Sequence, residues 1–202
     1  MKYIALILTF VCGIAQGATI DLATQVRGIL PPALGGEVTF KHYSATGDGS
    51  TDDTTAINNA LASSYTKIRC TSGTYIVTAL TISSKKEINL DSGCIIKEKN
   101  SGNGNILTIS ATADGTVIRG GEIDGNRSNQ TTGGWGIKTL ADDTVIDGVY
   151  IHDTYTMAIQ VYAADRVRIL NNRLVDANSY GIYAVAGTRE SYDLIISNNY
   201  IT

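Results

Sequence analysis

The chain has 202 residues, which is enough for one domain with a sizeable hydrophobic core. Glycine (21 residues) is far commoner than proline (2), aromatic residues are few and 17% of the residues are charged, a composition that suits a β protein rich in turns. The formal net charge of −3 provides no basic footprint and argues against nucleic acid as a partner.

Residues 1–17 have the pattern of a cleaved export signal. Lys2 supplies the positive charge, an apolar run follows, and the small residues Ala15 and Gly17 precede a cut ahead of Ala18. The run is too short for a comfortable membrane span. We therefore expect a secreted protein without a membrane span after cleavage of the signal.

Residues 18–37 are expected to form a linker. The run Val26-Arg-Gly-Ile-Leu-Pro-Pro-Ala-Leu-Gly-Gly36 is similar to the Val-x-Gly-x-Leu-Pro-x-x-x-Gly-Gly element of bacteriophage tail-fibre and tailspike proteins. The alternative is an ordinary linker rich in proline and glycine.

The stretch 44–62 predicts a glycine-rich loop followed by a short helix. The loop Gly47-Asp-Gly-Ser-Thr-Asp-Asp-Thr54 offers Thr51 or Asp52 as the N-cap, and its acidic groups suit the positive end of a helix. The apolar residues that follow recur at helical spacing and predict a buried stripe: Ala56, Ile57, Ala60 and Leu61.

One six-residue phrase recurs through most of the remaining chain. Its clearest copy is Ile118-Arg-Gly-Gly-Glu-Ile123, and the others begin at Cys70, Leu90, Ile146, Ile169 and Ile196. The steps between successive copies are 20, 28, 28, 23 and 27 residues. A similar unit at uneven steps of this size is typical of a solenoid, with the insertions placed in loops.

Each phrase is interpreted as two strand segments that meet at a tight corner. Its first and sixth residues are apolar or nearly so, which points both of them inward. The fourth residue is usually Gly or Asn, which enter the left-handed backbone region at little cost. We therefore expect these residues to stack along one axis: Gly73, Gly93, Gly121, Asn172 and Asn199. Val149 breaks the pattern, so Gly148 is expected to take the strained position there.

A second phrase falls between the corners and predicts the third strand of each coil. Its copies are Gly136-Ile137, Ala158-Ile159 and Gly181-Ile182, with Asn105-Ile106 as a weaker fourth. The Leu-x-x-Leu-x-Leu spacing of a leucine-rich horseshoe is missing. The fold class is therefore all-β: a single-stranded right-handed parallel β-helix of about six coils, with the short N-terminal helix covering its open end.

Two cysteines lie outside the predicted signal. On the alignment of the phrases Cys70 points inward, whereas Cys94 is the fifth residue of its phrase and lies just past the corner. Their side chains are not expected to meet, so no disulfide is expected.

Three motifs together resemble the pectate-lyase-like right-handed β-helix family. They are Gly47-Asp-Gly-x-x-Asp-Asp-Thr54 with its helix, Gly73-Thr-Tyr75, and Gly120-Gly-Glu-Ile-Asp-Gly-Asn126. The family includes phage tailspike depolymerases and relatives of rhamnogalacturonase. The resemblance implies an extracellular or virion-tail protein that binds polysaccharide and cleaves it as a lyase or a glycoside hydrolase. For a tailspike it also implies a homotrimer.

The resemblance covers roughly residues 38–202, which are expected to form one β-helix domain after the signal (1–17) and the linker (18–37). The sequence stops in the middle of a coil, so this domain is expected to be incomplete at its C-terminus. The leading function is a polysaccharide-binding and -degrading protein of the tailspike type. The alternative is a non-catalytic β-helix that serves as a structural or adhesive spacer.

Three aspartates are candidate catalytic groups. Asp153 and Asp176 each lie two residues past the end of a phrase, so they share one column on neighbouring coils with backbones roughly 4.8 Å apart. Carboxylates that close raise each other's proton affinity and can supply the acid and the base or nucleophile of a glycosidase. Asp124 lies beside this column one coil earlier. The alternative is that these aspartates start loops and bind nearby backbone amides.

His152 is better explained as a surface strand residue than as a proton-transfer group. A lyase needs an Arg or Lys base instead, for which Arg127, Lys138 and Arg166 are candidates. No cofactor is expected, apart from calcium if the protein is a lyase. The acids of the loop at 47–54 lack the EF-hand spacing and are better explained by helix capping.

Aromatic and basic side chains beside the long loops and third strands are candidates for substrate binding, because sugar rings stack on aromatic faces. They are Trp135, Tyr155, Tyr180, Lys138 and Arg127, with Tyr162 and Tyr183 nearby. The alternative is that the tyrosines are ordinary residues of a β surface.

Overall fold

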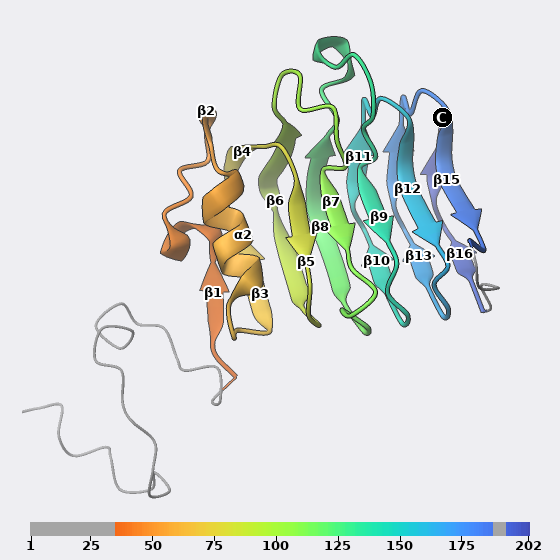
Figure 1. Ribbon diagram of the computed structural model, residues 1–202, viewed down its shortest axis with the longest axis horizontal. Coiled ribbons are helices and arrows are strands. Elements are labelled where there is room, and N and C mark those ends of the chain that lie inside the picture. The colour runs from red at the N-terminus through yellow and green to blue at the C-terminus, as the bar shows by residue number, and fades with distance from the viewer. Residues whose placement is uncertain (1–34, 188–192) are drawn as a thin grey trace, which may run out of the picture.

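The computed structural model describes residues 35–187 and 193–202, which wind into a parallel β-helix (Figure 1). The predicted signal and nearly all of the predicted linker lie outside the described residues. Within the described part of the chain, no helix has the length and apolar character needed to span a membrane.

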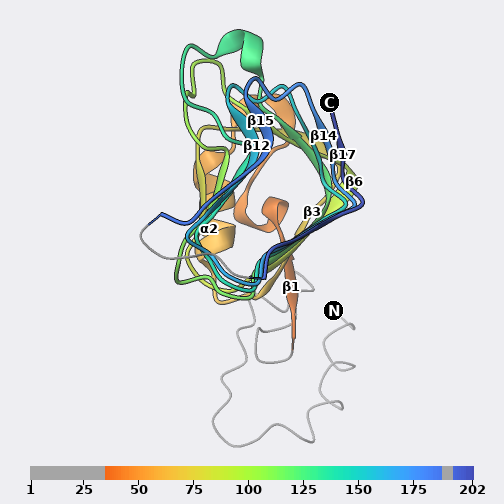
Figure 2. The ribbon, with the colours of Figure 1, turned by 90° about the vertical axis from the view of Figure 1, so that its right-hand side faces the viewer.

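The coils build three faces, which are seen end-on in Figure 2. The first face contains β1 (Glu37–Thr39), β3 (Lys67–Cys70), the start of β6 (Glu87–Glu98) and of β8 (Val117–Asp124), β10 (Val145–Asp147), β13 (Arg168–Leu170) and β16 (Ile195–Ser197). The second contains β2 (Asp48–Asp52), β4 (Gly73–Val77), the ends of β6 and β8, β11 (Tyr150–His152), β14 (Arg173–Val175) and β17 (Tyr200–Ile201). The third contains β5 (Leu80–Ile82), β7 (Leu107–Ile109), β9 (Ile137–Thr139), β12 (Met157–Tyr162) and β15 (Tyr180–Val185).

The strands of neighbouring coils pair in parallel, as predicted. Because β6 and β8 run through the corner between the first and second faces, these two faces form one 12-stranded sheet, and the third face is a separate 5-stranded sheet. The longest loops join the second face to the third, and η3 (Arg127–Asn129) lies in one of them (Figure 1).

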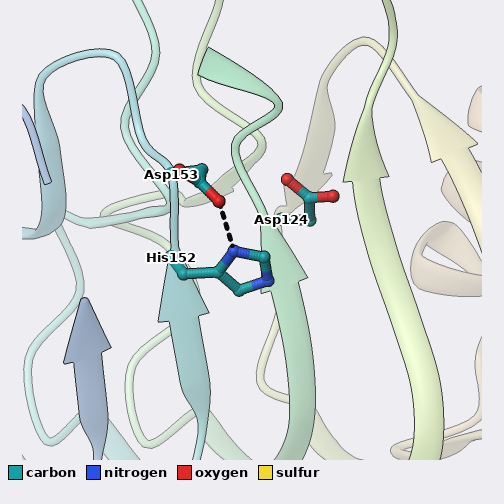
Figure 3. A group of neighbouring side chains, drawn as sticks. All are labelled: Asp124, His152 and Asp153. Atoms are coloured by element: carbon teal, nitrogen blue, oxygen red, sulfur yellow. Dashed lines mark hydrogen bonds and ion pairs between the residues drawn. The ribbon is translucent and has the colours of Figure 1, made fainter. Parts of the chain in front are cut away.

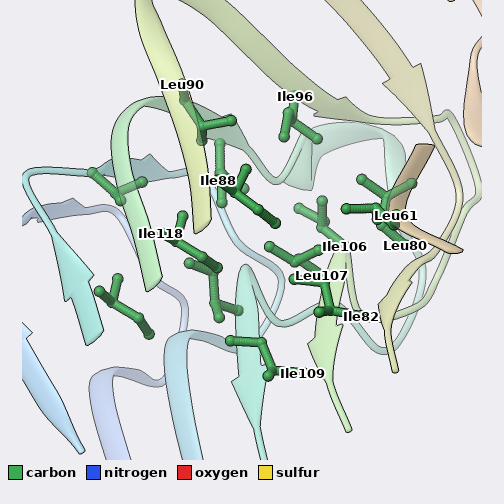
Figure 4. Close-up of a cluster of buried hydrophobic side chains, with 14 of the residues drawn as sticks. Leu61, Leu80, Ile82, Ile88, Leu90, Ile96, Ile106, Leu107, Ile109 and Ile118 are labelled. Atoms are coloured by element: carbon green, nitrogen blue, oxygen red, sulfur yellow. The ribbon is translucent and has the colours of Figure 1, made fainter. Parts of the chain in front are cut away.

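One column of aliphatic side chains lines the interior of each face. The first-face column is Ile68, Ile88, Ile118, Ile146, Ile169 and Ile196. The column on the second face includes Ile123, Ile151, Leu174 and Ile201. The column on the third face includes Leu107, Ile137, Ile159 and Ile182. All of these residues are buried except Ile182, which is partly buried, and the exposed Ile196 and Ile201, and Figure 4 shows part of this core. The predicted inward positions are confirmed from Ile118 onward.

The alignment of the phrases is wrong in the first two coils. The first-face column begins at Ile68 and Ile88, two residues before the predicted Cys70 and Leu90. On the second face the error is a single residue, because Gly73 pairs with Cys94 rather than with Gly93.

The prediction that the cysteines stay apart is wrong for the same reason. A shift of one residue turns a strand side chain to the opposite face, so Cys94 points into the core. Cys70 and Cys94 are fully buried and form a disulfide, with their Cα atoms 5.8 Å apart.

In the last three corners the left-handed residue is the third of the phrase, as predicted for Gly148 but not for the two corners that follow, where the fourth residue was expected. Gly148, Asn171 and Asn198 have φ angles of 67°, 56° and 57°. The fourth-position Asn172 is buried instead, and its main-chain N–H donates to Oδ1 of Asn199 at 2.9 Å. The fourth residues therefore still stack in these late coils, where Asn172 and Asn199 form an asparagine ladder stabilised by amide hydrogen bonds.

Replacing Asn172 by alanine is expected to lower the free energy of unfolding by about 2–6 kcal/mol, because two buried main-chain groups lose a partner at about 1–3 kcal/mol each. The side chain accepts from Val149 N at 2.9 Å and donates to Ile146 O at 3.0 Å. Chemical denaturation measures the change. Asn178→Ala, at an exposed position, is the control and is expected to change stability by less than about 0.5 kcal/mol.

The helix α2 (Thr54–Ala62) forms where it was predicted, and its buried residues are Ile57, Ala60 and Leu61. Its N-cap is Asp53, one residue after the predicted Asp52. α2 packs beside β5 and takes the third-face position in the first coil (Figure 1). Phe40 of η2 (Phe40–Tyr43) packs edge-on against Tyr75 with ring centroids 5.6 Å apart. α2 and η2 therefore cover the first coil together.

Candidate functional site

Outward side chains on the second face gather around His152, at the end of β11 (Figure 3). Lys97, Asp124 and His152 occupy the same position on three successive coils. Each follows a buried isoleucine of the inward column, and side chains alternate along a strand, so all three point outward.

Both ring nitrogens of His152 face a carboxylate. Nδ1 lies 2.8 Å from Oδ2 of Asp153, and Nε2 lies 3.1 Å from Oε1 of Glu122. Burial lowers the pKa of His152, but the hydrogen bonds to Asp153 and Glu122 and the charge of Asp124 raise it by more, so that the pKa lies above its ordinary value of 6.5. The imidazolium form, with an N–H on each nitrogen, is thus favoured, and it is a proton donor near neutral pH.

Asp124 brings a third carboxylate close to His152. One carboxylate oxygen of Asp124, one of Asp153 and one ring nitrogen of His152 all lie within 4.8 Å of one another. Lys97 Nζ donates to Asp124 at 2.6 Å, and Asn126 N donates to it at 2.7 Å. The cluster thus places a proton donor between two carboxylates that are held in fixed positions.

Asp153 is positioned by its own backbone and by the loop that follows β8. Its φ angle of 50° lies in the left-handed region, which Asp tolerates better than most residues. A Cβ at Gly125 would overlap the main chain of Asp153, so glycine there lets the loop lie directly against it. Arg127 N donates to Asp153 O at 3.0 Å, and the Arg127 guanidinium lies 3.9 Å from the Asp153 carboxylate. Asp153 therefore faces both His152 and Arg127.

Asp176 follows Asp153 in the same column, and it also has a left-handed backbone, with φ of 54°. Its main-chain oxygen accepts a hydrogen bond from Arg127 Nη1 at 2.9 Å. Within residues 35–187 and 193–202 its carboxylate forms no hydrogen bond or ion pair. The structure therefore links Asp153 with Glu122 through His152, places Asp124 close by, and leaves the Asp176 carboxylate outside the hydrogen-bonded cluster.

Tyr150 and Arg173 extend the cluster along the second face. The ring of Tyr150 stacks on His152 with centroids 4.6 Å apart, and the guanidinium of Arg173 lies 4.7 Å from the Tyr150 ring. An aromatic ring and a cation are therefore presented beside the proton donor.

The cluster opens onto a hollow of about 230 Å³ lined by Lys97, Asp124, Asn126, Arg127, Ser128 and Asp153. A hollow of about 370 Å³ adjoins it at Lys97 and Asn126, and another of about 350 Å³ lies beside Glu122 and Tyr150. Concave surface on two sides of the cluster suits an extended ligand better than a small enclosed one.

The donor atoms around His152 do not fit a calcium ion. Calcium prefers several oxygen ligands, whereas here the Lys97 ammonium already occupies a position 2.6 Å from Asp124. Both ring nitrogens of His152 are also engaged by carboxylates. A bound cation would have to displace these contacts.

The residues predicted to bind substrate are divided between two faces. Arg127 belongs to the His152 cluster, whereas Lys138 lies on the third face with its Nζ 4.8 Å from the Trp135 ring centroid and 5.1 Å from that of Tyr162. Arg166, a candidate lyase base, forms an ion pair with Asp143 at 2.7 Å instead.

Tyr180 and Tyr155 are the two remaining tyrosines that were predicted to bind substrate. Tyr180 is half-exposed and stacks on Tyr183 with centroids 5.3 Å apart. Tyr155 donates from its hydroxyl to Thr131 O at 2.8 Å and so fixes the loop before Trp135. The aromatic rings of Trp135 and Tyr162, with Lys138 between them, therefore form the most compact predicted sugar-binding surface.

Sequence reasoning missed Glu122 and Lys97 and undervalued His152. The pairs Glu122 and Tyr150, and Asp124 and His152, occupy matching positions of two phrases, so the repeat contained the signal. Lys97 was not recognised as a site residue, because the alignment of the repeated phrases was shifted by one residue on its coil.

Glu98, next to Lys97, is a buried carboxyl group whose charge is poorly compensated. Burial raises its pKa to about 6 despite a hydrogen bond from Gly104 N, and its Oε2 has no hydrogen-bond partner among the described residues. Because folding favours the protonated form, this group stabilises the fold below the ordinary carboxyl pKa of 4.5, and that contribution is lost as the pH rises towards 6.

Glu98→Gln is therefore expected to raise the free energy of unfolding at pH 7 by about 2 kcal/mol, at 1.36 kcal/mol per pKa unit. Little change is expected at pH 4. Denaturation curves at the two pH values measure the difference, with Glu37→Gln at an exposed position as the control. Equal effects at both pH values would show that charge burial is not the cause.

No protein-family model and no curated protein matches this sequence. Several solved structures are similar to it, and three of them are compared with it below. A candidate glycosyl hydrolase from Parabacteroides merdae is 18% identical with a TM-score of 0.65, and the match covers 81% of this chain and 94% of that one. The surface adhesin PfbA of Streptococcus pneumoniae is 21% identical with a TM-score of 0.66, over 81% of this chain and 48% of the adhesin. The Dettilon tailspike protein is 18% identical with a TM-score of 0.53, over 81% and 39%.

The chain therefore spans less than half of the adhesin and of the tailspike, and nearly all of the candidate hydrolase. At such low identities the similarity concerns the fold. The parallel coils, the three faces and the register agree with the family resemblance of the sequence motifs. The chain has the pectate-lyase-like right-handed parallel β-helix fold.

Proposed function

We propose that the protein binds an anionic polysaccharide and cleaves it at the His152 cluster, as a secreted or virion-associated protein of the tailspike type. The observation that carries this proposal is the position of His152 between Glu122 and Asp153, which raises its pKa. The adjoining hollow presents two cations, Lys97 and Arg127, to an anionic sugar.

Either route of glycosidic cleavage can use these groups. In both, the protonated His152 gives its proton to the departing glycosidic oxygen. In hydrolysis, Asp124 or Asp153 activates water or attacks the anomeric carbon. In β-elimination, a base removes the C5 proton of a uronate, the C4–O4 bond breaks and a C4–C5 double bond forms. Lys97 and Arg127 bind the sugar carboxylate in either case.

Three further observations support this proposal. The disulfide between Cys70 and Cys94 suits an oxidising compartment outside the cytosol. The similar solved structures include a candidate glycosyl hydrolase and a phage tailspike. On the third face, Trp135 and Tyr162 with Lys138 between them suit the stacking of sugar rings and offer a second contact for the same chain.

Incubation with a panel of anionic and neutral polysaccharides tests the proposal. New reducing ends without an ultraviolet-absorbing product indicate hydrolysis, and reducing ends with a product that absorbs through a new C4–C5 double bond indicate elimination. Added EDTA is expected to leave the rate unchanged, because the cluster does not fit a calcium ion. Light scattering of the same sample tests the proposed homotrimer.

The second candidate function is a non-catalytic spacer or adhesin. It is favoured by the similarity to PfbA and by the ion pair between Lys97 and Asp124, which satisfies the cluster internally. Binding to a polysaccharide without cleavage of any panel member would support it.

A further inference from the structure

Another hollow lies on the first face, away from the His152 cluster. It measures about 510 Å³ and is larger than the hollows beside His152. Its charged lining residues are Lys67, Lys85, Lys86, Glu87 and Arg119. Four cationic side chains thus share the space with a single carboxylate, in a protein whose overall charge is negative.

The carboxylate in this hollow neutralises only part of its charge. Glu87 lies 3.3 Å from Arg119, and both are well exposed, so the pair is weak. Lys67 and Lys85 form no ion pair with any residue in the described ranges. Asp143, whose pKa the charge of Lys85 helps to lower, is held by Arg166 through two hydrogen bonds of 2.7 and 2.9 Å.

Lys86 is the least ordinary of these cations, because it is only 2% exposed. Its ammonium donates to Ser63 O at 2.6 Å and to Tyr65 O at 2.8 Å, which leaves the third N–H without a described acceptor. Burial lowers its pKa. A buried ammonium is costly unless a negative charge compensates it, and an anion in the hollow, which Lys86 helps to line, would supply such a charge nearby.

We propose that this hollow, lined by Lys67, Lys85, Lys86 and Arg119, binds a sulfate or phosphate group carried by a larger ligand. The four positive charges exceed by three what the one carboxylate neutralises, and a doubly charged tetrahedral anion offers several acceptor oxygens to separate ammonium groups. The site does not depend on the proposed cleavage, because its residues lie on another face of the solenoid.

Isothermal titration calorimetry at low ionic strength tests the proposal with inorganic phosphate, inorganic sulfate and acetate. Saturable binding of phosphate and sulfate is expected, with acetate at least about 10-fold weaker. In the variant Lys67→Gln/Lys85→Gln, phosphate affinity is expected to fall at least about 10-fold. Lys41→Gln, at an exposed position on η2, is the matched control and keeps wild-type affinity. Thermal unfolding checks that each variant is folded.

Three results would overturn the proposal: no saturable phosphate binding, equal binding by acetate, or unchanged phosphate affinity in the double variant. Phosphate binding that is lost in His152→Gln would assign the anion to the other site, and so would also contradict it. Dextran sulfate and unmodified dextran then show whether the anion is recognised on a glycan. A protein that binds phosphate but cleaves no polysaccharide would retain this site and lose only the proposed function.

Discussion

Replacing His152 by glutamine is expected to lower the rate of polysaccharide cleavage by about 100-fold or more, because general acid catalysis contributes roughly 10²- to 10⁴-fold. Glutamine can still donate or accept one hydrogen bond towards Glu122 or Asp153, so the fold is expected to persist. Initial rates on the best substrate of the panel, measured with matched circular dichroism spectra, give the comparison. A variant that keeps more than half of the activity would remove His152 from the mechanism.

His42→Gln is the matched control for this experiment. His42 is the only other histidine of the chain, and its Nδ1 accepts a hydrogen bond from Thr39 N at 3.0 Å in a capping box. Glutamine is suited to that capping position. Wild-type activity is therefore expected in the control.

The same cluster predicts a pH dependence. As a proton donor, His152 works below its pKa, so activity is expected to fall as the pH rises through a value above 6.5. Asp153→Asn removes one cause of the raised pKa and is expected to move this fall to lower pH as well as to slow cleavage. Asp176→Asn, in the same column, is expected to change neither property strongly, and this comparison separates the two predicted aspartates.

Removing the disulfide is expected to lower the free energy of unfolding by about 3 kcal/mol, because the bond closes a loop of 24 residues that is otherwise free in the unfolded chain. The variant Cys70→Ala/Cys94→Ala measures this loss by chemical denaturation. Wild-type protein under reducing conditions is the control that keeps both sulfur atoms and removes only the crosslink.

Thiol titration of the denatured, unreduced protein lacking residues 1–17 is expected to find no free thiol. Two free thiols per chain, or equal stability of the oxidised and reduced protein, would contradict the crosslink. A loss in the alanine variant that exceeds the effect of reduction would measure the packing of the two buried sulfur atoms.

The repeat predicted most of the fold, because every coil of a β-helix has nearly the same geometry and therefore needs similar residues at matching positions. Ile118, Ile146, Ile169 and Ile196 recur because each must fill the same inward position, and the register between coils confirms them. The first coils were harder to align, because their corners differ in length. β6 bulges between Leu90 and Ile95, and no residue pattern signals that shift.

The candidate site was predicted less well than the fold. Asp153 and Asp124 were found because they lie at or just after the ends of strands in successive coils, but the carboxylates that flank His152 depend on side-chain direction. The one-residue error that separated the cysteines also removed Lys97 from its column beside Asp124. The spacing of residues in the sequence indicated the coil to which each residue belongs. It did not indicate which residues pair across the sheet, because that depends on the register between strands.

The pKa of His152, measured by NMR from its ring protons, tests the central claim most directly, with His42→Gln used to assign the signals. The cluster of Glu122, Asp153 and Asp124 predicts a pKa above 6.5, and an anionic oligosaccharide bound beside the ring is expected to raise it further. A pKa at or below 6.5 that does not respond to any oligosaccharide of the panel would contradict a proton donor at this position.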